Sequence, residues 1–377
     1  MSPRPLVPRR AALGALLAGP LSAACPAAAS AIPALREAAA ARGLVFGTEV
    51  LWRELAANPD YAALVSREAA ALTPGLEAKW STLRPGPEIF DFAPLDRLLD
   101  YAAGHAMQLR LHTLVWGPEL PAWAREAIAE GGATGGAKGG AEALLTRHVA
   151  TVVGHCRGRA LAWDVANEIT DPRWSRGPEG LTYTPWRKAL GPEVIPLAFH
   201  LAHEADPAAL LFLNDDLLEY EGPQQEEKRA TYLRLIEGWR RRGVPIHGFG
   251  LEAHLDPARP FAEKPYRAFL AALADLGLVL HVTELDVRDQ ALPAALPARD
   301  RAAAETVRRY LDVALDEKAV RLVATWGLSN RFTWYNADRT MRRADGLPAR
   351  PLPFDAEMAP TAMHAALLRA LAGAPAR

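Results

Sequence analysis

Apolar, strand-like runs alternate with amphipathic stretches along this chain of 377 residues, and no other feature constrains its fold as strongly. Eight runs have the length and composition of buried strands. They are Leu44–Glu49, Ala70–Leu76, Gln108–Val115, Ala160–Asn167, Leu210–Asp215, His247–His254, Leu278–Leu285 and Leu322–Leu328. Eight strands that alternate with helices over roughly 330 residues predict an α/β fold, a (β/α)8 TIM barrel that forms a single domain.

The stretches between these runs have helical periodicity, and two of them end close to a glycine. The expected helices are Leu95–Ala103, Ala143–Cys156, Pro192–Glu204, Glu226–Arg241, Pro265–Leu276 and Arg301–Asp316. Gly243 and Gly277 follow two of these helices as C-terminal caps do. An open, doubly wound sheet is the alternative fold, but its first strand normally leads into a glycine-rich phosphate loop, which Gly47-Thr48-Glu49 is not. The glycine-rich run Glu130–Ala141 predicts a flexible loop.

The amino terminus has the pattern of a secretory signal. Arg9-Arg10 precede an apolar run, Ala11–Ala24, and Ala29-Ser30-Ala31 has the form of a cleavage site. We therefore expect residues 1–31 to be a signal peptide and residues 32–377 to be the barrel domain. An arginine pair directly before the apolar run is typical of the twin-arginine type of signal. The protein would then be secreted or periplasmic. An uncleaved membrane anchor is the alternative, although the apolar run is too short to span a bilayer comfortably.

Composition excludes several other classes of protein. A formal net charge of -1 argues against a nucleic-acid partner, because phosphate binding needs a basic surface. No later segment has the apolar length of a membrane span, so we expect no membrane partner after signal removal. We expect neither a metal site nor a cofactor, because the sequence has no His-x-His near the first strand and no phosphate loop.

Polar and aromatic residues occur at or just beyond the carboxyl end of each expected strand. They are Glu49, Lys79, Trp116, Glu168, Asp215, His254, Glu284 and Trp326. Active sites of such barrels are built at that face. A carboxylate at the end of a buried strand is costly to desolvate unless it is paired or used, and paired carboxylates carry out glycoside hydrolysis. Glu168 and Glu284 are thus candidates for such a pair; two buried glutamates in salt bridges are the alternative.

The segments that contain these two glutamates resemble signatures of glycoside hydrolase family 10, the endo-xylanases. Trp163–Glu168 resembles W-D-V-x-N-E, and His281–Asp286 resembles the family's T-E-L-D segment. Further matches follow in the family's order at Thr73-Pro74, Lys79-Trp80, Arg110–Trp116, Pro121–Trp123, Gly248–Leu255 and Thr325–Trp334. The resemblance extends from Leu44 to the carboxyl end and agrees with the predicted barrel.

This resemblance implies a retaining endo-1,4-β-xylanase that hydrolyses internal β-1,4-xylosidic bonds by double displacement. It makes Glu168 the acid/base and Glu284 the nucleophile, with His254 holding the nucleophile and Asp286 orienting His254. Contacts with the substrate are expected from Lys79, His112, Trp116, Asn167, Glu252, Trp326 and Trp334. The expected partner is the polysaccharide substrate, xylan or xylo-oligosaccharides, and we expect the protein to be a monomer. We assign Trp80, Trp123 and Trp163 to structure.

The chain departs from the family pattern around this core. Gly75-Leu76 stands where the family has Glu-Asn, a pair that binds the sugar two units from the cut on the non-reducing side. Glu252 replaces a glutamine and adds a third carboxylate, which we expect to be protonated or to alter the pH optimum. Two alternatives therefore stay open: a β-glycanase of the same barrel type that acts on another β-linked or decorated oligosaccharide, and a non-catalytic carbohydrate-binding protein.

Overall fold

Parallel strands form a closed ring at the centre of the computed structural model, which describes residues 33–133, 137–171 and 179–377. The strands are β1 (Val45–Val50), β2 (Ala71–Pro74), β3 (Gln108–Val115), β4 (Ala162–Asn167), β5 (Leu210–Asp215), β6 (Gly248–Leu251), β7 (His254–Leu255), β8 (Val279–Val287) and β9 (Val320–Thr325). Strands β1 to β6 pair with one another in sequence order, β9 pairs with β1 and β8, and β6 pairs with β8, which closes the ring. The two-residue strand β7 pairs only with β8 and is not part of the ring. This ring of eight strands confirms the predicted (β/α)8 barrel.

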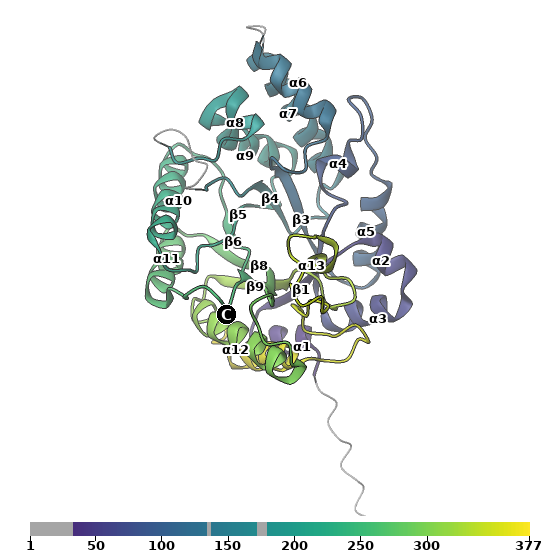
Figure 1. The fold of residues 1–377 in the computed structure, drawn as a ribbon. Helices are drawn as coiled ribbons and strands as arrows, with labels where there is room; N and C mark the ends of the chain where they lie inside the picture. The colour runs from purple at the N-terminus through teal and green to yellow at the C-terminus, as the bar shows by residue number, and fades with distance from the viewer. Residues whose placement is uncertain (1–32, 134–136, 172–178) are drawn as a thin grey trace, which may run out of the picture. The chain divides into compact units, whose positions relative to one another are not determined.

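Helices surround the barrel (Figure 1). They are α1 (Leu35–Ala40), α2 (Trp52–Ala57), α3 (Pro59–Glu68), α4 (Trp80–Leu83), α5 (Ala93–Gly104), α6 (Ala122–Ala133), α7 (Ala137–His155), α8 (Pro185–Leu190), α9 (Val194–Ala205), α10 (Pro223–Arg241), α11 (Glu263–Asp275), α12 (Leu296–Ala314), α13 (Trp334–Ala337) and α14 (Ala362–Gly373). Within the described ranges, no helix combines the length and the apolar character needed to cross a membrane. The predicted signal segment, residues 1–31, lies outside the described residues.

The barrel helices form where apolar residues recur at the helical period. In α5, Leu95, Leu98, Leu99 and Ala102 are all buried, which is the i, i+3, i+4, i+7 spacing of one helix face. Burial of that face against the strands stabilises the helix more than its intrinsic propensity does. The helices expected from the sequence do not include α1, α2, α3, α4, α6, α8, α13 or α14.

The prediction of a flexible loop across Glu130–Ala141 is wrong for the described part of that run. Helix α6 continues to Ala133, and α7 already begins at Ala137. The two helices pack against each other, and Ala141 and Leu145 of α7 are fully buried. Extending a helix that is already anchored costs less than nucleating a new one, so the anchored ends outweigh the low propensity of glycine.

The sixth predicted strand is broken in the structure. Strand β6 ends at Leu251, Ala253 has a φ of +63°, and the chain resumes as β7, which pairs with the last residues of β8. The left-handed residue changes the direction of the chain directly before His254, so that His254 lies in register with Asp286 of β8. The prediction of one continuous strand from His247 to His254 therefore missed the bend that brings these two side chains together.

The interior of the barrel changes from apolar to polar along the strands. At the amino ends, Ala71, Leu322 and Ala324 form a small cluster with Val45 of β1. Gly47 faces the same cluster, because a Cβ built on it would lie 3.2 Å from the Cβ of Ala71. Side chains alternate along a strand, so Glu49, two residues further, points inward at the mouth. Polar groups are thus placed at the carboxyl ends of the strands, where barrel active sites lie.

Candidate active site

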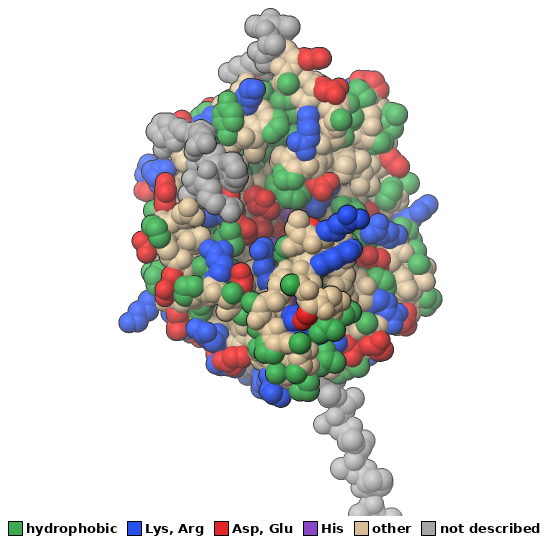
Figure 2. Space-filling model, in the orientation of Figure 1, with side chains coloured by type: hydrophobic (Ala, Val, Ile, Leu, Met, Phe, Trp, Pro, Cys, Tyr) green, Lys and Arg blue, Asp and Glu red, His purple; other side chains and the backbone are tan. Residues whose placement is uncertain are grey.

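Acidic side chains gather in the hollow at the centre of the face shown in Figure 2. Glu168 reaches the mouth of the barrel from the end of β4, and its φ of +50° is rare for any residue other than glycine. Its N–H donates to the carbonyl of Asn214 on β5, 2.9 Å away, which continues the sheet through this conformation. Glu284 comes from β8 and is 5 % exposed. The structure therefore brings both predicted glutamates to one face of the barrel.

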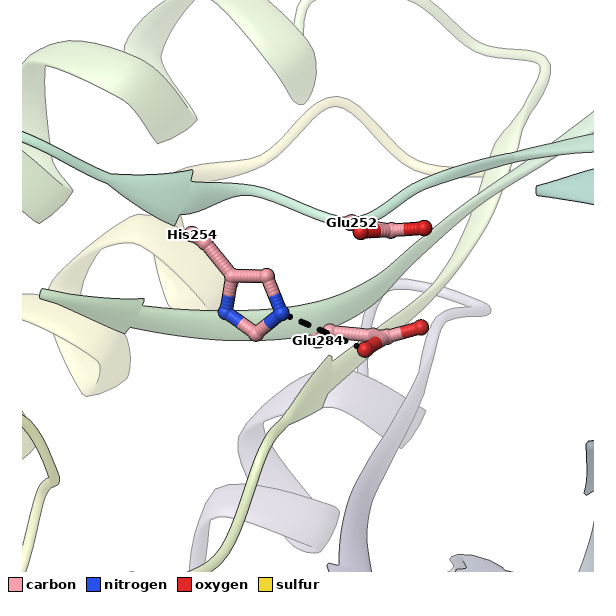
Figure 3. Close-up of side chains that lie close together, drawn as sticks. All are labelled: Glu252, His254 and Glu284. Atoms are coloured by element: carbon pink, nitrogen blue, oxygen red, sulfur yellow. Dashed lines mark ion pairs between the residues drawn. The ribbon is translucent and has the colours of Figure 1, made fainter. Parts of the chain in front are cut away.

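Glu284 is held by two neighbouring side chains. The His254 Nε2 lies 3.3 Å from its Oε2, and Nδ2 of Asn214 donates to its Oε1 over 2.8 Å. Figure 3 shows the His254 ring directed at the Glu284 carboxylate, with the Glu252 carboxyl beside it. These bonds fix the direction of the Glu284 carboxylate, and the residue predicted to hold Glu284 is in contact with it.

His254 is in turn held by Asp286. The Nδ1 of His254 lies 2.9 Å from Oδ1 of Asp286. Glu284 and Asp286 are two residues apart on β8, so both face the same side of the strand. Asp286 is fully buried and also accepts hydrogen bonds from Nε1 of Trp334 (3.0 Å) and from the hydroxyl of Tyr335 (2.7 Å). The predicted contacts, from Asp286 through His254 to Glu284, are present. Tyr335 also belongs to this hydrogen-bonded group, which the sequence did not reveal.

The surroundings of Glu284 keep it ionised. Burial alone would raise its pKa, but the hydrogen bond from His254 and the nearby charges of His112, His254 and Arg110 lower the pKa of Glu284 to about 2. Burial also disfavours the charged form of His254, yet Asp286 and Glu284 raise the pKa of His254 well above its ordinary value. A carboxylate that is ionised over the whole range in which most proteins are folded suits the role of a nucleophile.

Glu168 has the opposite electrostatic environment. Burial, together with the nearby carboxylates of Asp216, Asp215 and Glu284, raises the pKa of Glu168 to about 8. Its Oε2 accepts a hydrogen bond from Nε1 of Trp116 over 3.0 Å, and Nδ2 of Asn167 lies 3.3 Å from its Oε1. Glu168 is therefore protonated at neutral pH, as a general acid must be. Two carboxyl groups whose pKa values are moved apart by their environments are characteristic of an acid and nucleophile pair.

Asn214 connects the parts of the site, and the sequence analysis missed it. Its Nδ2 lies within hydrogen-bond distance of Asn167 (2.8 Å), Glu252 (3.1 Å) and Glu284 (2.8 Å). Its Oδ1 accepts from the hydroxyl of Thr283 over 2.8 Å. Asn214 stands near the end of β5, next to Asp215, the residue of this strand that the sequence places at the mouth. Asp215 instead pairs with Lys228 of α10 (2.6 Å), so it faces away from this group of side chains.

A buried ion pair supports the sugar-binding candidates from below. Asp164 of β4 accepts hydrogen bonds from both terminal nitrogens of the Arg110 guanidinium, and it lies 2.9 Å from Nδ1 of His112. All three side chains are almost completely buried. His112, predicted to contact the substrate, is therefore fixed in orientation. Its contact with a sugar stays a prediction.

The tryptophans expected to bind sugar rings have additional partners. Nζ of Lys79 lies 4.8 Å from the ring centre of Trp116 and 5.9 Å from that of Trp326, so Lys79 stands between two aromatic faces. Trp116 donates its indole N–H to Glu168, and Trp334 donates to Asp286. The indole groups thus position the acids as well as line the mouth, a role that the sequence did not reveal. Their stacking on sugar rings stays a prediction.

The three tryptophans assigned to structure lie in the packed layer between strands and helices. Trp163 is fully buried. Trp80 donates its N–H to the carbonyl of Leu114 over 2.7 Å, and Trp123 donates to that of Arg84 over 3.1 Å. Each ring packs against the apolar core.

Glu252 lies directly against the nucleophile. It is 2 % exposed, and its Oε1 accepts the hydrogen bond from Asn214. Burial raises its pKa well above the ordinary value, and the charges of Glu284 and Glu168 raise the pKa further. Glu252 is consequently a neutral acid beside an ionised Glu284, which agrees with one of the two expectations drawn from the sequence.

We predict that Glu252→Gln changes kcat/KM only about threefold near pH 5, midway between the pKa values of about 2 for Glu284 and about 8 for Glu168. Glutamine has the shape of the protonated acid and also donates a hydrogen bond, so little is lost. Glu252→Leu is the matched control: it can neither accept the hydrogen bond from Asn214 nor donate one, so it should lose tenfold or more because buried polar groups are left without a partner. A large effect of Glu252→Gln would show that Glu252 is ionised in the working enzyme.

One group of side chains here has the composition of a metal site. Glu252, His254 and Glu284 each offer one ligand atom, and these atoms lie within 4.8 Å of one another. A cation bound there would occupy the Glu284 carboxylate and the His254 nitrogen that bonds to it. It would compete with the nucleophilic role of Glu284, so the arrangement gives no reason to place a metal in the reaction. The absence of a metal cofactor stays a prediction.

We predict that Asp286→Asn moves the acidic limb of the pH profile of kcat/KM to higher pH. The limb reports ionisation of Glu284, whose pKa of about 2 depends on His254. Asp286 raises the pKa of His254, so removing its charge weakens the positive charge next to Glu284 and lets the pKa of Glu284 rise. A pH profile of initial rates measures this shift. An unmoved limb with a lower plateau would mean that Asp286 only supports packing.

Comparison with known proteins agrees with this geometry. The family model described as glycosyl hydrolase family 10 matches residues 34–370. A β-1,4-xylanase of Dictyoglomus thermophilum is 33 % identical over 288 residues, which cover 73 % of this chain and 75 % of that protein. Endo-1,4-β-xylanase B of Thermotoga neapolitana is 34 % identical over 277 residues, 73 % of this chain and 74 % of that one.

Solved structures give the same answer. The crystal structure of xylanase 10B from Thermotoga petrophila in complex with xylobiose matches with a TM-score of 0.78 and 29 % identity, over 90 % of this chain and 97 % of that one. Native xylanase 10B from Thermotoga maritima matches with a TM-score of 0.77 and 28 % identity, over 90 % and 98 % of the two chains. A family model that spans the barrel, relatives that align over most of it and a shared fold lead to one conclusion: this chain belongs to glycosyl hydrolase family 10.

Proposed function

We propose that this protein is a retaining endo-1,4-β-xylanase that cuts internal bonds of xylan. The observation that carries the proposal is a pair of carboxyl groups held in opposite environments at one barrel mouth. Glu168 is bonded to Trp116 and has its pKa raised to about 8, whereas Glu284 is held by His254 and Asn214 and has its pKa lowered to about 2. Xylan is the substrate class named for the relatives, and one matching structure is described as a complex with xylobiose.

In the first step, the Glu284 carboxylate attacks the anomeric carbon while Glu168 gives its proton to the leaving oxygen. The carbon–oxygen bond to the leaving sugar breaks, and a glycosyl ester of Glu284 forms. His254 and Asn214 hold the attacking carboxylate in place through the bonds described above. The indole N–H of Trp116 holds the carboxyl group that donates the proton.

In the second step, Glu168 takes a proton from water, which attacks the same carbon and releases Glu284. The charge of Glu284 contributes to the raised pKa of Glu168. Once Glu284 is an ester, that charge is gone and the pKa of Glu168 falls. Glu168, which has just given away its proton, therefore stays ionised and can act as the base. Two displacements at one carbon give net retention of configuration.

Assays on xylan, cellulose and an aryl β-xylobioside test this function. We expect reducing ends from xylan, release of the phenol from the xylobioside, and far less turnover of cellulose. Turnover of another β-linked polysaccharide alone would favour the alternative of a different β-glycanase. Binding of xylan without turnover of any substrate would favour a non-catalytic carbohydrate-binding protein. A product profile on linear xylo-oligosaccharides separates internal from terminal cutting.

We also propose that the protein is exported and acts as a monomer in the periplasm or outside the cell. The support is the sequence of residues 1–31, with Arg9-Arg10, an apolar run and Ala29-Ser30-Ala31. Mass spectrometry of the exported protein should find an amino terminus at Ile32. Protein retained in the cytoplasm with an intact amino terminus would contradict export, and light scattering tests the monomer.

A further inference from the structure

Glu49 is a carboxyl group at the barrel mouth that the proposed mechanism does not use. It is the last inward-facing residue of β1 and is partly exposed. Its carboxyl group makes no hydrogen bond or ion pair with any residue that the structure describes. The neighbouring Glu77 differs, because its oxygens accept the backbone N–H groups of Trp52 (2.7 Å) and Leu76 (3.3 Å). Glu49 is therefore free to bind a ligand in the cleft, whereas Glu77 is committed to the backbone.

Gly75 makes room for the Glu49 carboxyl group, and Gly327 lies near the other oxygen of that group. Strand β1 lies between β2 and β9, and a glycine follows each of these neighbours. A Cβ built on Gly75 would overlap the Glu49 carboxyl group, whose Cδ would lie only 2.9 Å away. A Cβ on Gly327 would lie 3.8 Å from the other carboxyl oxygen. Gly75 does not have a positive φ, so its backbone does not require glycine; the space for Glu49 does.

The charges around Glu49 favour a neutral acid. Burial raises its pKa well above the ordinary value, and Glu54 and Glu77 raise the pKa further, while Lys79 lowers it. Glu284 is also close enough to raise it. A neutral carboxyl group both donates and accepts hydrogen bonds, which is the chemistry that a sugar hydroxyl requires.

The position of β1 indicates which sugar Glu49 meets. Glu168, on β4, protonates the leaving sugar in the proposed function, so that sugar lies over the β4 side of the mouth. Strands β2 and β3 separate β1 from β4, which places Glu49 on the side of the sugars that stay on the enzyme. Glu49 fills the space beside position 75. In the family pattern the residue at that position contacts the second of these sugars, counted from the cut.

We propose that Glu49 hydrogen-bonds a hydroxyl of the sugar two units from the cut on the non-reducing side, and so supplies from β1 the contact that Gly75 cannot make. The proposal rests on the proposed function and adds to it a residue that sets specificity. A hydrogen bond to this sugar is thus still made, but from β1 instead of from the residue that follows the adjacent strand β2.

Kinetics on two aryl glycosides with the same phenol test the proposal. Glu49→Ala should lower kcat/KM on the aryl β-xylobioside about tenfold and leave the aryl β-xyloside within about twofold, because only the first has the second sugar. Equal losses on both substrates, or no loss on either, would overturn it. Glu54→Ala removes a nearby carboxyl group of α2 and should leave both rates unchanged. Activity of the unaltered protein on the xylobioside tests the proposed function separately.

A double variant tests whether the two positions share one space. Gly75→Glu alone should lose activity on the xylobioside, because a Cβ at position 75 overlaps the Glu49 carboxyl group and forces it out of its place. Glu49→Ala combined with Gly75→Glu returns one carboxyl group to that space and should be several-fold more active on the xylobioside than Glu49→Ala alone. A double variant no better than Glu49→Ala would refute the exchange. Thermal unfolding of each variant shows whether it is folded.

Discussion

Replacing Glu284 by alanine is expected to lower kcat on xylan by at least about 10⁴-fold, because no covalent intermediate can form without the attacking carboxylate. The surroundings of Glu284 lower its pKa to about 2, and two side chains fix its direction. Glu252 cannot replace it, because burial and neighbouring charges keep Glu252 protonated.

The loss in Glu284→Ala must be separated from unfolding. The variant should keep its affinity for xylo-oligosaccharides, measured by calorimetry, and its far-ultraviolet circular dichroism. Azide is small enough to enter the space left by the carboxylate, so it should restore turnover of an aryl β-xylobioside and give a glycosyl azide. Residual activity within tenfold of the unaltered protein, without any added nucleophile, would exclude Glu284 as the nucleophile.

Replacing Glu168 by alanine is expected to produce a loss that depends on the leaving group. On xylan the loss should be about 10²- to 10⁴-fold, the usual contribution of general acid catalysis. An aryl β-xylobioside with an acidic phenol needs no protonation to leave, so its first step should be far less affected. The intermediate then accumulates, because no base activates water, and a burst of phenol should precede a slow steady state.

The pH profile gives a second readout of Glu168. In the unaltered protein kcat/KM should fall above pH 8 as Glu168, with its pKa of about 8, loses the proton that it must donate. This alkaline limb should disappear in Glu168→Ala when a good leaving group is used. A limb that persists at the same pH would assign it to another group, and losses that are equal for xylan and for the activated substrate would show that Glu168 is not the acid.

The barrel itself could be predicted from the sequence because buried strands and amphipathic helices have distinct periods. The contacts that run from Asp286 through His254 to Glu284 could also be predicted, because residues two apart on a strand share a face. Glu284 and Asp286 illustrate this, and the structure places both toward His254. Local pattern thus reveals what lies on one face of one element.

Contacts between elements far apart in the sequence were harder to foresee. Asn214 contacts Asn167 of β4, Glu284 of β8 and Glu252 in the bend between β6 and β7. In the sequence it is one polar residue before an aspartate. Tyr335 lies on α13, and nothing local links its hydroxyl to Asp286. The bend at Ala253 depends on a positive φ at a residue that rarely adopts one. Each of these features depends on tertiary packing rather than on local propensity.

Gly75 shows the same limit in a different form. From the sequence it is a missing side chain, and a weakened sugar contact is the natural expectation. In the structure its empty space is filled by the carboxyl group of Glu49, from a strand more than twenty residues earlier in the chain. The effect of a missing side chain at Gly75 can therefore be understood only together with the side chain that the neighbouring strand β1 places there.

The most direct test of the account is to identify the residue that carries the sugar. An aryl xylobioside with fluorine at the 2-position of the attacked sugar slows release of the intermediate, and mass spectrometry of the digested protein then locates the label. We predict a label on Glu284 that is absent from Glu284→Ala. A label on Glu252, or complete inactivity of the reagent while the protein turns over unmodified xylobioside, would contradict the assignment of Glu284 as the nucleophile.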